Sequence, residues 1–464
     1  MKFKDLFKPV DMTVGNPVRQ IVAFTIPMLL GNIAQQLYNT VDSIIVGRFV
    51  GDNALAAVGS AGPILNLMLV LFIGIATGAS IMVSQYFGAR QRDELSKTIC
   101  SCITMTGIAS AVIMIVGPLL SLPLLRLLGT PESIIYWCRD YLIIIFVGIA
   151  GSGYYNILGG ILRGLGDSVS ALIYLLVATA LNIVLDYAFV AWFGMGVAGV
   201  ALATIIAQLV SALLSIRKLA RMTDIFNLKK EYLHPASKYS VSLIRLGLPS
   251  GLTQAIFSMS MIVVQSLTNS FGEQFIAANV IVMRIDGFVM LPAFSFGTTM
   301  TTYAGQNIGA GRMDRVLKGA REGTLTAMAT SAVLTALILL FGKPLMGVFT
   351  TTEDLINLSY RMMQILAFGY IMVEITQCLS GIMRGAGDTV TPMWISLISS
   401  VALRVPLAYI MVWMTRTEDN PLGNPAMIFA SLLISWCFGS LITLFFYHRG
   451  KWKGKAIVET SEPR

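Results

Sequence analysis

Acidic and amide side chains occur at helical spacing inside long apolar stretches of the sequence. Gln35, Tyr38 and Asp42 are spaced i, i+3, i+7, and Asn182 and Asp186 are spaced i, i+4. Both spacings put the side chains on one face of a helix. A charged side chain at the centre of a bilayer costs about 2.5–3.5 kcal/mol on insertion scales, so each such residue is a candidate for function.

These residue types favour binding of a small cation. Two neighbouring carboxyl groups each increase the tendency of the other to hold a proton, and a proton or a sodium ion between them relieves the repulsion. Oxygen ligands suit a hard cation. Asn156 and Thr204 add polar groups from two further apolar stretches. The predicted cation site therefore contains Gln35, Tyr38, Asp42, Asn156, Asn182, Asp186 and Thr204. The alternative is an interhelical hydrogen-bond network that holds the helices together.

Composition places the whole chain in a membrane. Hydrophobic residues make up 55% and charged residues 12% of the 464 residues, and the mean hydropathy is +0.75. Soluble domains average about 25% charged residues. Apolar runs of about 18 or more residues are typical of membrane helices. We predict an all-α protein with twelve spans, at about 19–47, 54–85, 98–122, 136–162, 168–192, 197–216, 243–270, 277–303, 322–345, 354–383, 389–414 and 425–447.

Cysteine and histidine usage argues against disulfide, zinc and enzyme chemistry. The five cysteines are scattered without a paired C-x-x-C spacing, and the two histidines lie at positions 234 and 448, outside the predicted spans. Such a pattern suggests neither a disulfide framework nor a zinc site. We expect no enzymatic activity, no cofactor and no bound metal other than a possible sodium ion at the cation site.

The distribution of basic residues predicts the orientation. With the N-terminus inside, the inside segments hold 25 of the 33 Lys and Arg residues, the outside segments five, and the spans three. This bias places both termini and the 217–242 linker in the cytoplasm. The polar, basic first twenty residues are interpreted as a retained tail and not a signal peptide. The net charge of +9 then follows from topology, and no nucleic-acid partner is expected.

The sequence contains an internal duplication. GGILRGLGDSVS (159–170) matches SGIMRGAGDTVT (380–391), and SQYFGARQRDELSK (84–97) matches GQNIGAGRMDRVLK (305–318), both at an offset of 221 residues. The repeat predicts two six-helix bundles related by a pseudo-two-fold axis along the membrane normal. The predicted parts are an N-terminal lobe (1–216), a linker (217–242), a C-terminal lobe (243–447) and a cytoplasmic tail (448–464).

The repeated Arg-Gly-x-Gly-Asp motif is interpreted as a structural turn. Arg163 and Arg384 are suited to the C-terminal ends of helices, where a cation interacts favourably with the helix dipole. The glycines permit a tight reversal of the chain. Asp167 and Asp388 can cap the helices that follow.

The second half lacks the acids of the first. The positions that match Asp42 are Val263 or Val264, and those that match Asp186 are Leu407 or Ala408. If the acids served only to pack a six-helix unit, the second copy would need them too. The second half instead carries a different set of charges within its predicted spans: Arg284, Asp286, Arg361, Glu374 and Arg404. Internal ion pairing is one interpretation of this set.

The motifs together resemble the multidrug and toxic compound extrusion family, most closely its DinF-like prokaryotic branch. The resemblance rests on the opening IPMLLGNIAQQLYNTVDSIIVGRFVG, the QYFGAR and QNIGAG loops and the paired RGLGD and RGAGD turns. It implies cation-coupled export of organic, often cationic compounds from a cavity between two bundles. It also implies that the seven residues of the predicted site line the family's first-half cation site. Some members use a carboxylate in the seventh span for sodium, and this sequence has none between Leu243 and Ser270.

Two further features bear on the transport cycle. Pro27 interrupts the first span and removes a helical hydrogen bond, and the resemblance implies that this position is a moving hinge, the alternative being a static kink. Methionine and aromatic side chains suit binding of varied cationic or flat compounds. Candidate substrate-lining residues are Met259, Met261, Met283, Phe288 and Met290. Ordinary core or lipid-facing packing is the alternative for each of them.

The sequence as a whole predicts an antiporter that exports small organic compounds by alternating access. Its coupling ion, H+ or Na+, is left open. The alternative is a flippase for lipid-linked saccharides, for which the second-half arginines would supply basic groups. We expect a monomer in contact with membrane lipid in a prokaryotic plasma membrane, the inner membrane of a cell with two membranes.

Overall fold

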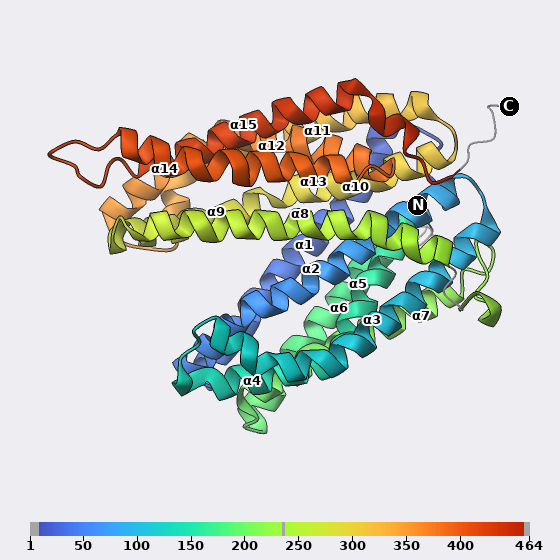
Figure 1. Ribbon diagram of the computed structural model, residues 1–464, viewed down its shortest axis with the longest axis horizontal. Helices are drawn as coiled ribbons and strands as arrows, with labels where there is room; N and C mark the ends of the chain where they lie inside the picture. Colours follow the sequence, from blue (N-terminus) through green and yellow to red (C-terminus); the bar gives the residue numbers. More distant parts are fainter. Residues whose placement is uncertain (1–8, 234–236, 459–464) are drawn as a thin grey trace. The chain divides into compact units, whose positions relative to one another are not determined.

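The computed structural model describes residues 9–233 and 237–458, and within these residues it contains helices and no strands. Figure 1 shows the course of the chain. The first half contains α1 (Pro17–Phe49), α2 (Asp52–Gly88), α3 (Arg92–Leu127), α4 (Glu132–Val147), α5 (Ile149–Gly164), α6 (Ser168–Tyr187) with its π-helical extension η2 (Ala188–Trp192), α7 (Gly196–Ala220) and the short η3 (Lys230–Leu233). The second half contains α8 (Ser237–Asn269), α9 (Glu273–Val289), α10 (Leu291–Gly309), α11 (Met313–Gly347), α12 (Glu353–Gly385), α13 (Val390–Ser396), the π-helical η4 (Leu397–Leu403), α14 (Arg404–Met414), α15 (Ala426–Arg449) and η5 (Lys451–Gly454).

The helices match the number of predicted spans. Eleven helical segments of the described chain are long and apolar enough to cross a membrane. One further pair, α4 and α5, passes the same test together but is bent by 53°. If this pair is one span, the total is twelve, as predicted from the sequence. Helices satisfy their own backbone hydrogen bonds, which is why apolar sequences of this length adopt them in lipid.

The chain forms two compact units whose limits fall inside helices. Unit 1 consists of the described residues within Met1–Asp11 and Ile26–Gly251, and unit 2 of those within Met12–Thr25 and Leu252–Arg464. The limits therefore lie beside Pro27 in α1 and beside Pro249 in α8. In this division the beginning of α1 belongs to unit 2 and the beginning of α8 belongs to unit 1, whereas the predicted lobes divide the chain at the 217–242 linker.

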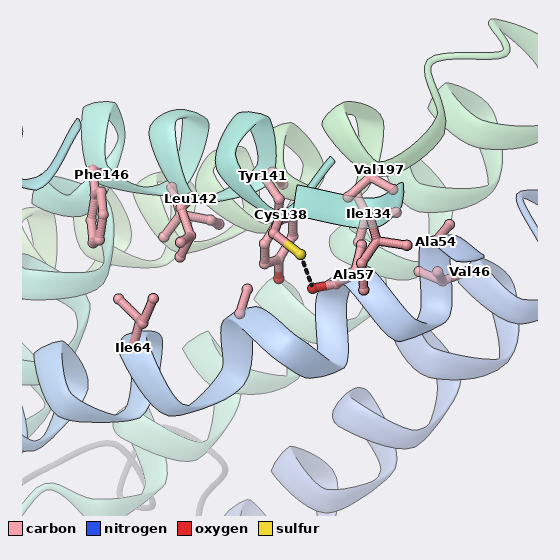
Figure 2. Packing of buried hydrophobic residues seen from close by; sticks show 14 of the residues in the cluster. Val46, Ala54, Ala57, Ile64, Ile134, Cys138, Tyr141, Leu142, Phe146 and Val197 are labelled. Atoms are coloured by element: carbon pink, nitrogen blue, oxygen red, sulfur yellow. Dashed lines mark hydrogen bonds between the residues drawn. The ribbon is translucent and has the colours of Figure 1, made fainter. Parts of the chain in front are cut away.

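Unit 1 has an apolar core between α2 and α4. Figure 2 shows Tyr141 and Phe146 of α4 on the side that faces Ala57 and Ile64 of α2. Cys138 donates a hydrogen bond to the carbonyl oxygen of Ala57 at 3.4 Å. This hydrogen bond joins α4 to α2 within the core.

Close helix contacts hold the start of α8 in unit 1. A side chain at Gly74 of α2 would place its Cβ 2.6 Å from the carbonyl oxygen of Gly247. Small residues let membrane helices approach this closely. The hydrophobic effect does not drive helices together in lipid, so close van der Waals packing contributes to holding them. The same segment is joined to α3 by Glu94, whose Oε2 accepts from Lys238 at 3.1 Å and from Tyr239 at 3.0 Å.

Unit 2 repeats the contacts of unit 1 at the predicted offset. Ser359 donates to the carbonyl oxygen of Ala278 at 3.4 Å, and both residues are 221 positions after Cys138 and Ala57. The apolar core of unit 2 is assembled in the same way from α9, α12, α14 and α15. The duplication seen in the sequence therefore extends to individual contacts in the core.

The paired turns are built as predicted. Asp167 accepts a hydrogen bond from the backbone N–H of Ser170 at 2.9 Å, and Asp388 accepts one from Thr391 at 3.2 Å. Gly166 has a φ of +88°, a value that favours glycine. These turns therefore serve to cap α6 and to start α13.

The two units differ in where their helices break. In unit 1 the span of α4 and α5 is interrupted at Gly148, whereas its counterpart α12 runs without interruption from Glu353 to Gly385. Conversely, α2 is continuous, and its counterpart is divided at Met290 between α9 and α10. The break at Gly148 was not apparent from the sequence, because its glycine counterpart at position 369 remains helical, whereas the break at Met290 is marked by Pro292 in the first turn of α10.

Candidate cation site

Two carboxyl groups meet within unit 1. Asp42 comes from α1 and Asp186 from α6, and the two groups are close enough to interact. Asp186 and Asn182, one turn apart on α6, are fully buried, and Asp42 is half-buried. The packing of unit 1 therefore brings the two acids, which the sequence analysis assigned to one site, close to each other.

Several polar atoms of this cluster lack hydrogen-bond partners in the described part of the chain. They are both carboxyl oxygens of Asp186, both amide atoms of Asn182 and Oδ1 of Asp42. A buried polar atom without a partner costs about 1–3 kcal/mol, and a buried charge without one costs more. The cluster is therefore suited to a proton or a metal cation that would satisfy these oxygens.

Hydroxyl groups complete the cluster on two other helices. Tyr38 of α1 donates to Oγ1 of Thr204 of α7 at 3.3 Å. Tyr141 of α4 is buried and interacts electrostatically with Tyr38, Asp42 and Asp186. Tyr141 was not among the predicted site residues, because its only signal is a phenol within the apolar run YLIIIFV.

Gln35 and Asn156 line two cavities whose walls do not include Asp42 or Asp186. Gln35 shares a cavity of about 110 Å³ with Pro27 and Arg163. Asn156 donates to the carbonyl oxygen of Ser152 at 2.9 Å and lines a second cavity of about 60 Å³. Arg163 lines both cavities. The structure thus groups five of the seven predicted residues, the two acids among them, and places Gln35 and Asn156 at two separate cavities of unit 1.

The backbone beside the acid is irregular. The π-helical segment η2 (Ala188–Trp192) begins two residues after Asp186. Segments of this kind are frequent at functional sites, because they alter the register of the side chains on either side. No residue pattern in the sequence predicts this segment.

Unit 2 contains a different charged cluster. The guanidinium of Arg404 is buried, its Nη1 lies 3.5 Å from Sδ of Met261, and it interacts electrostatically with Asp286. The hydroxyl of Tyr370 lies close to Asp286 and donates to Sδ of Met363 at 2.8 Å. Internal charge interaction is therefore one explanation of Asp286 and Arg404, although Oδ1 of Asp286 and Nε of Arg404 have no hydrogen-bond partner among the described residues.

The remaining second-half charges are not part of this cluster. Arg284 and Arg361 are exposed on their helices. Glu374 is buried, and its Oε2 has no hydrogen-bond partner within the described residues. Lipid or headgroup contact suits the two arginines, whereas Glu374 is a second buried acid.

The residues proposed to line a substrate cavity have varied surroundings. Met259 and Phe288 are exposed, and Met290 packs in the core of unit 2. Met261 and Met283 line a cavity of about 30 Å³ together with Arg404.

Pro27 lies inside α1, which continues through it.

The cluster differs from an ordinary transition-metal site. Within residues 9–233 and 237–458 there is no group of three or more His, Cys, Asp or Glu side chains that could hold a metal ion. A sodium ion at Asp42 and Asp186 would need amide, hydroxyl or water oxygens as further ligands.

A family model called MatE matches the chain twice, at residues 27–188 and 249–410. The chain belongs to the MatE family. The two matched ranges are 222 residues apart, which agrees with the duplication predicted from the sequence. The resemblance to the multidrug and toxic compound extrusion family is thereby confirmed, and the DinF-like branch stays a prediction.

Named relatives cover almost the whole MatE chain. The probable multidrug resistance protein YoeA of Bacillus subtilis is 30% identical over 95% of each chain. The probable multidrug resistance protein YpnP of the same organism is 31% identical, over 96% of this chain and 98% of its own length. A solved outward-facing MATE family transporter of the MOP superfamily has a TM-score of 0.88 at 24% identity and covers 95% of this chain and 97% of its own. This likeness shows a common fold.

Proposed function

We propose that this MatE protein exports small organic compounds across a prokaryotic plasma membrane, driven by a gradient of H+ or Na+. Membership of the MatE family and relatives named as multidrug resistance proteins support the efflux function. These relatives do not favour the saccharide flippase considered from the sequence. The observation that carries the coupling is the pair of carboxyl groups of Asp42 and Asp186, which interact while three of their oxygens lack partners.

The proposed coupling arises because the cation-free site and the cation-bound site favour different conformations of unit 1. With both acids ionised and no cation, the carboxylates repel each other and α1 and α6 are pushed apart. A bound proton or sodium ion removes that repulsion and stabilises the closer arrangement of the two helices. A cation can shift a conformational equilibrium only by its difference in affinity for the two states. In this proposal the cation favours one state of unit 1 and the exported compound favours the other, with Pro27 as the hinge.

Transport by the purified protein in liposomes tests this function. The probe is the cationic dye ethidium, and its movement is followed with an imposed pH gradient, with an imposed sodium gradient and with neither. We expect gradient-driven uptake of the dye into liposomes whose transporters have their cytoplasmic side outward, with at least one gradient, and loss of that uptake in Asp42→Asn protein. Equal dye movement with and without both gradients would contradict cation coupling.

We also propose that both termini and the linker face the cytoplasm. The 25-to-5 distribution of basic residues supports this orientation. Single cysteines at Thr351 and Asn420 should react with an impermeant maleimide added outside intact cells, and one at Asp224 should react only after permeabilisation. All three positions are exposed. Labelling with the opposite sidedness would contradict the orientation.

A further inference from the structure

Unit 2 has an open groove between α11, α12 and α15. Its volume is about 540 Å³, within the roughly 300–1,000 Å³ of small-molecule sites. Apolar side chains from all three helices form its walls. They are Leu317, Leu325, Met328, Ile375, Leu379 and Leu444.

One end of the groove is basic. Arg321, His448 and Lys453 line it, and no acidic residue is among the lining side chains. None of the three forms an ion pair with a described residue. Two cationic side chains, Arg321 and Lys453, beside apolar walls are suited to an amphiphile whose head is anionic, and the imidazole of His448 offers a further hydrogen-bonding group.

The basic end is held in place by the turn after α15. Gly450 has a φ of +72° and reverses the chain into η5. Trp452 is buried, its ring stacks on Tyr447 at 5.3 Å, and its Nε1 donates to the carbonyl oxygen of Tyr447 at 2.8 Å. Lys453 is carried by this turn, with its Nζ 5.9 Å from the Trp452 ring centroid.

The matching face of unit 1 is covered by the protein itself. Ser96 and Thr104 of α3 are 221 positions before Leu317 and Leu325 of α11. Ser96 accepts a hydrogen bond from the N–H of Asn227 at 2.9 Å, and Thr104 donates to the carbonyl oxygen of Leu233 at 2.8 Å. The linker thus covers this face in unit 1, whereas in unit 2 the equivalent face borders the open groove.

We propose that the groove of unit 2 binds an anionic phospholipid. The phosphate lies among Arg321, His448 and Lys453, and an acyl chain lies along the apolar walls where the linker lies in unit 1. The groove is separate from the acid pair, and its positive charge repels the cationic compounds proposed for export. The predicted topology places its basic end in the cytoplasmic leaflet.

Native mass spectrometry of the whole protein with equal amounts of phosphatidylglycerol and phosphatidylethanolamine tests the proposal. Basic residues near a membrane surface each contribute enough attraction that we expect a preference for phosphatidylglycerol of at least about fivefold. The double variant Arg321→Gln/Lys453→Gln should lose this preference. The matched control Lys318→Gln/Lys451→Gln removes two exposed basic residues outside the groove and should keep it.

A second variant tests the apolar part without changing charge. Leu444→Trp fills the groove and should lower retention of both lipids. Excess inorganic phosphate should not displace phosphatidylglycerol from the wild-type protein. The proposal is overturned if the wild type shows no preference, if the control loses the preference as fully as the groove variant, if phosphate displaces the lipid, or if Leu444→Trp retains both lipids as the wild type does.

Discussion

Units 1 and 2 share a plan but carry charged side chains at different positions. Asn182 and Asp186 of unit 1 correspond, at an offset of 222 residues, to Arg404 and Ala408 of unit 2. Asp42 corresponds at the same offset to Val264. Unit 2 therefore carries a basic side chain that interacts electrostatically with its acid, Asp286, although Oδ1 of Asp286 also lacks a hydrogen-bond partner in the part of the chain that the structure describes, whereas in unit 1 the two acids interact with each other. The comparison predicts that unit 1 responds to external cations and that unit 2 does not.

The largest effect is expected from Asp186→Asn. This substitution removes one of two interacting charges with little change in size, and it should abolish gradient-driven export while leaving membrane insertion and folding intact. Dye transport in liposomes and gel filtration in detergent measure the two properties. Export at the wild-type rate would assign coupling to another acid, with Glu374 and Asp286 the first to test.

Arg404→Gln should affect stability more than coupling. Removing one partner of a buried charge pair costs about 3–5 kcal/mol, because the other charge is left without compensation. The variant should therefore unfold at a lower temperature, and the second substitution Asp286→Asn should restore part of the loss. Thermal unfolding in detergent measures both changes. If Arg404→Gln protein is as stable as the wild type but has lost cation dependence, the assignment of roles to the two units is wrong.

Tyr141→Phe should have an intermediate effect. Loss of one hydroxyl near the acid pair removes an interaction of about 1 kcal/mol, which corresponds to roughly a fivefold change in the cation concentration needed for half-maximal transport. The dependence of dye transport on cation concentration measures this change. Tyr154→Phe is the control, since its hydroxyl donates to the carbonyl oxygen of Ile103, away from the acids. Equal shifts in both variants would remove Tyr141 from the site.

The smallest effect is expected from Val264→Thr, at the counterpart of Asp42. A threonine hydroxyl can donate to the backbone carbonyl one turn earlier, as Thr268 does to Val264 at 3.0 Å. Coupling ratios measured in liposomes should be unchanged, and stability should fall only slightly. A clear change in coupling would mean that the second-half position participates directly.

The helices and the shared helical face of Asn182 and Asp186 were predictable because they depend on local periodicity, and the duplication was predictable because the two halves share sequence motifs, whereas the meeting of Asp42 with Asp186 was expected from their residue types and from the family resemblance. Apolar runs define the spans, and i, i+4 spacing puts Asn182 beside Asp186 whatever the surrounding fold. Tyr141 was not predictable, because its role depends on how α4 packs against α1 and α6. The bend at Gly148 was hidden for the same reason, since its counterpart Gly369 has the same residue type and stays helical.

The exposed groove of unit 2 illustrates the same limit. The basic residues Arg321 and Lys453 are far apart in the sequence, and only the turn at Gly450 brings them to one end of a groove. The sequence analysis counted both among the residues that set the orientation. Because both residues line one groove, we propose that they bind lipid in addition to contributing to the orientation of the protein in the membrane.

Cation release on substrate binding tests the central claim most directly. Purified protein in detergent is mixed with ethidium, and released protons are followed with a pH indicator while bound radioactive sodium is counted in parallel. We predict release of one kind of cation from the wild type and from Arg404→Gln protein, and no release from Asp42→Asn or Asp186→Asn protein that still binds the dye. Release that persists in both acid variants and disappears in Arg404→Gln would contradict the account and place the coupling cation in unit 2.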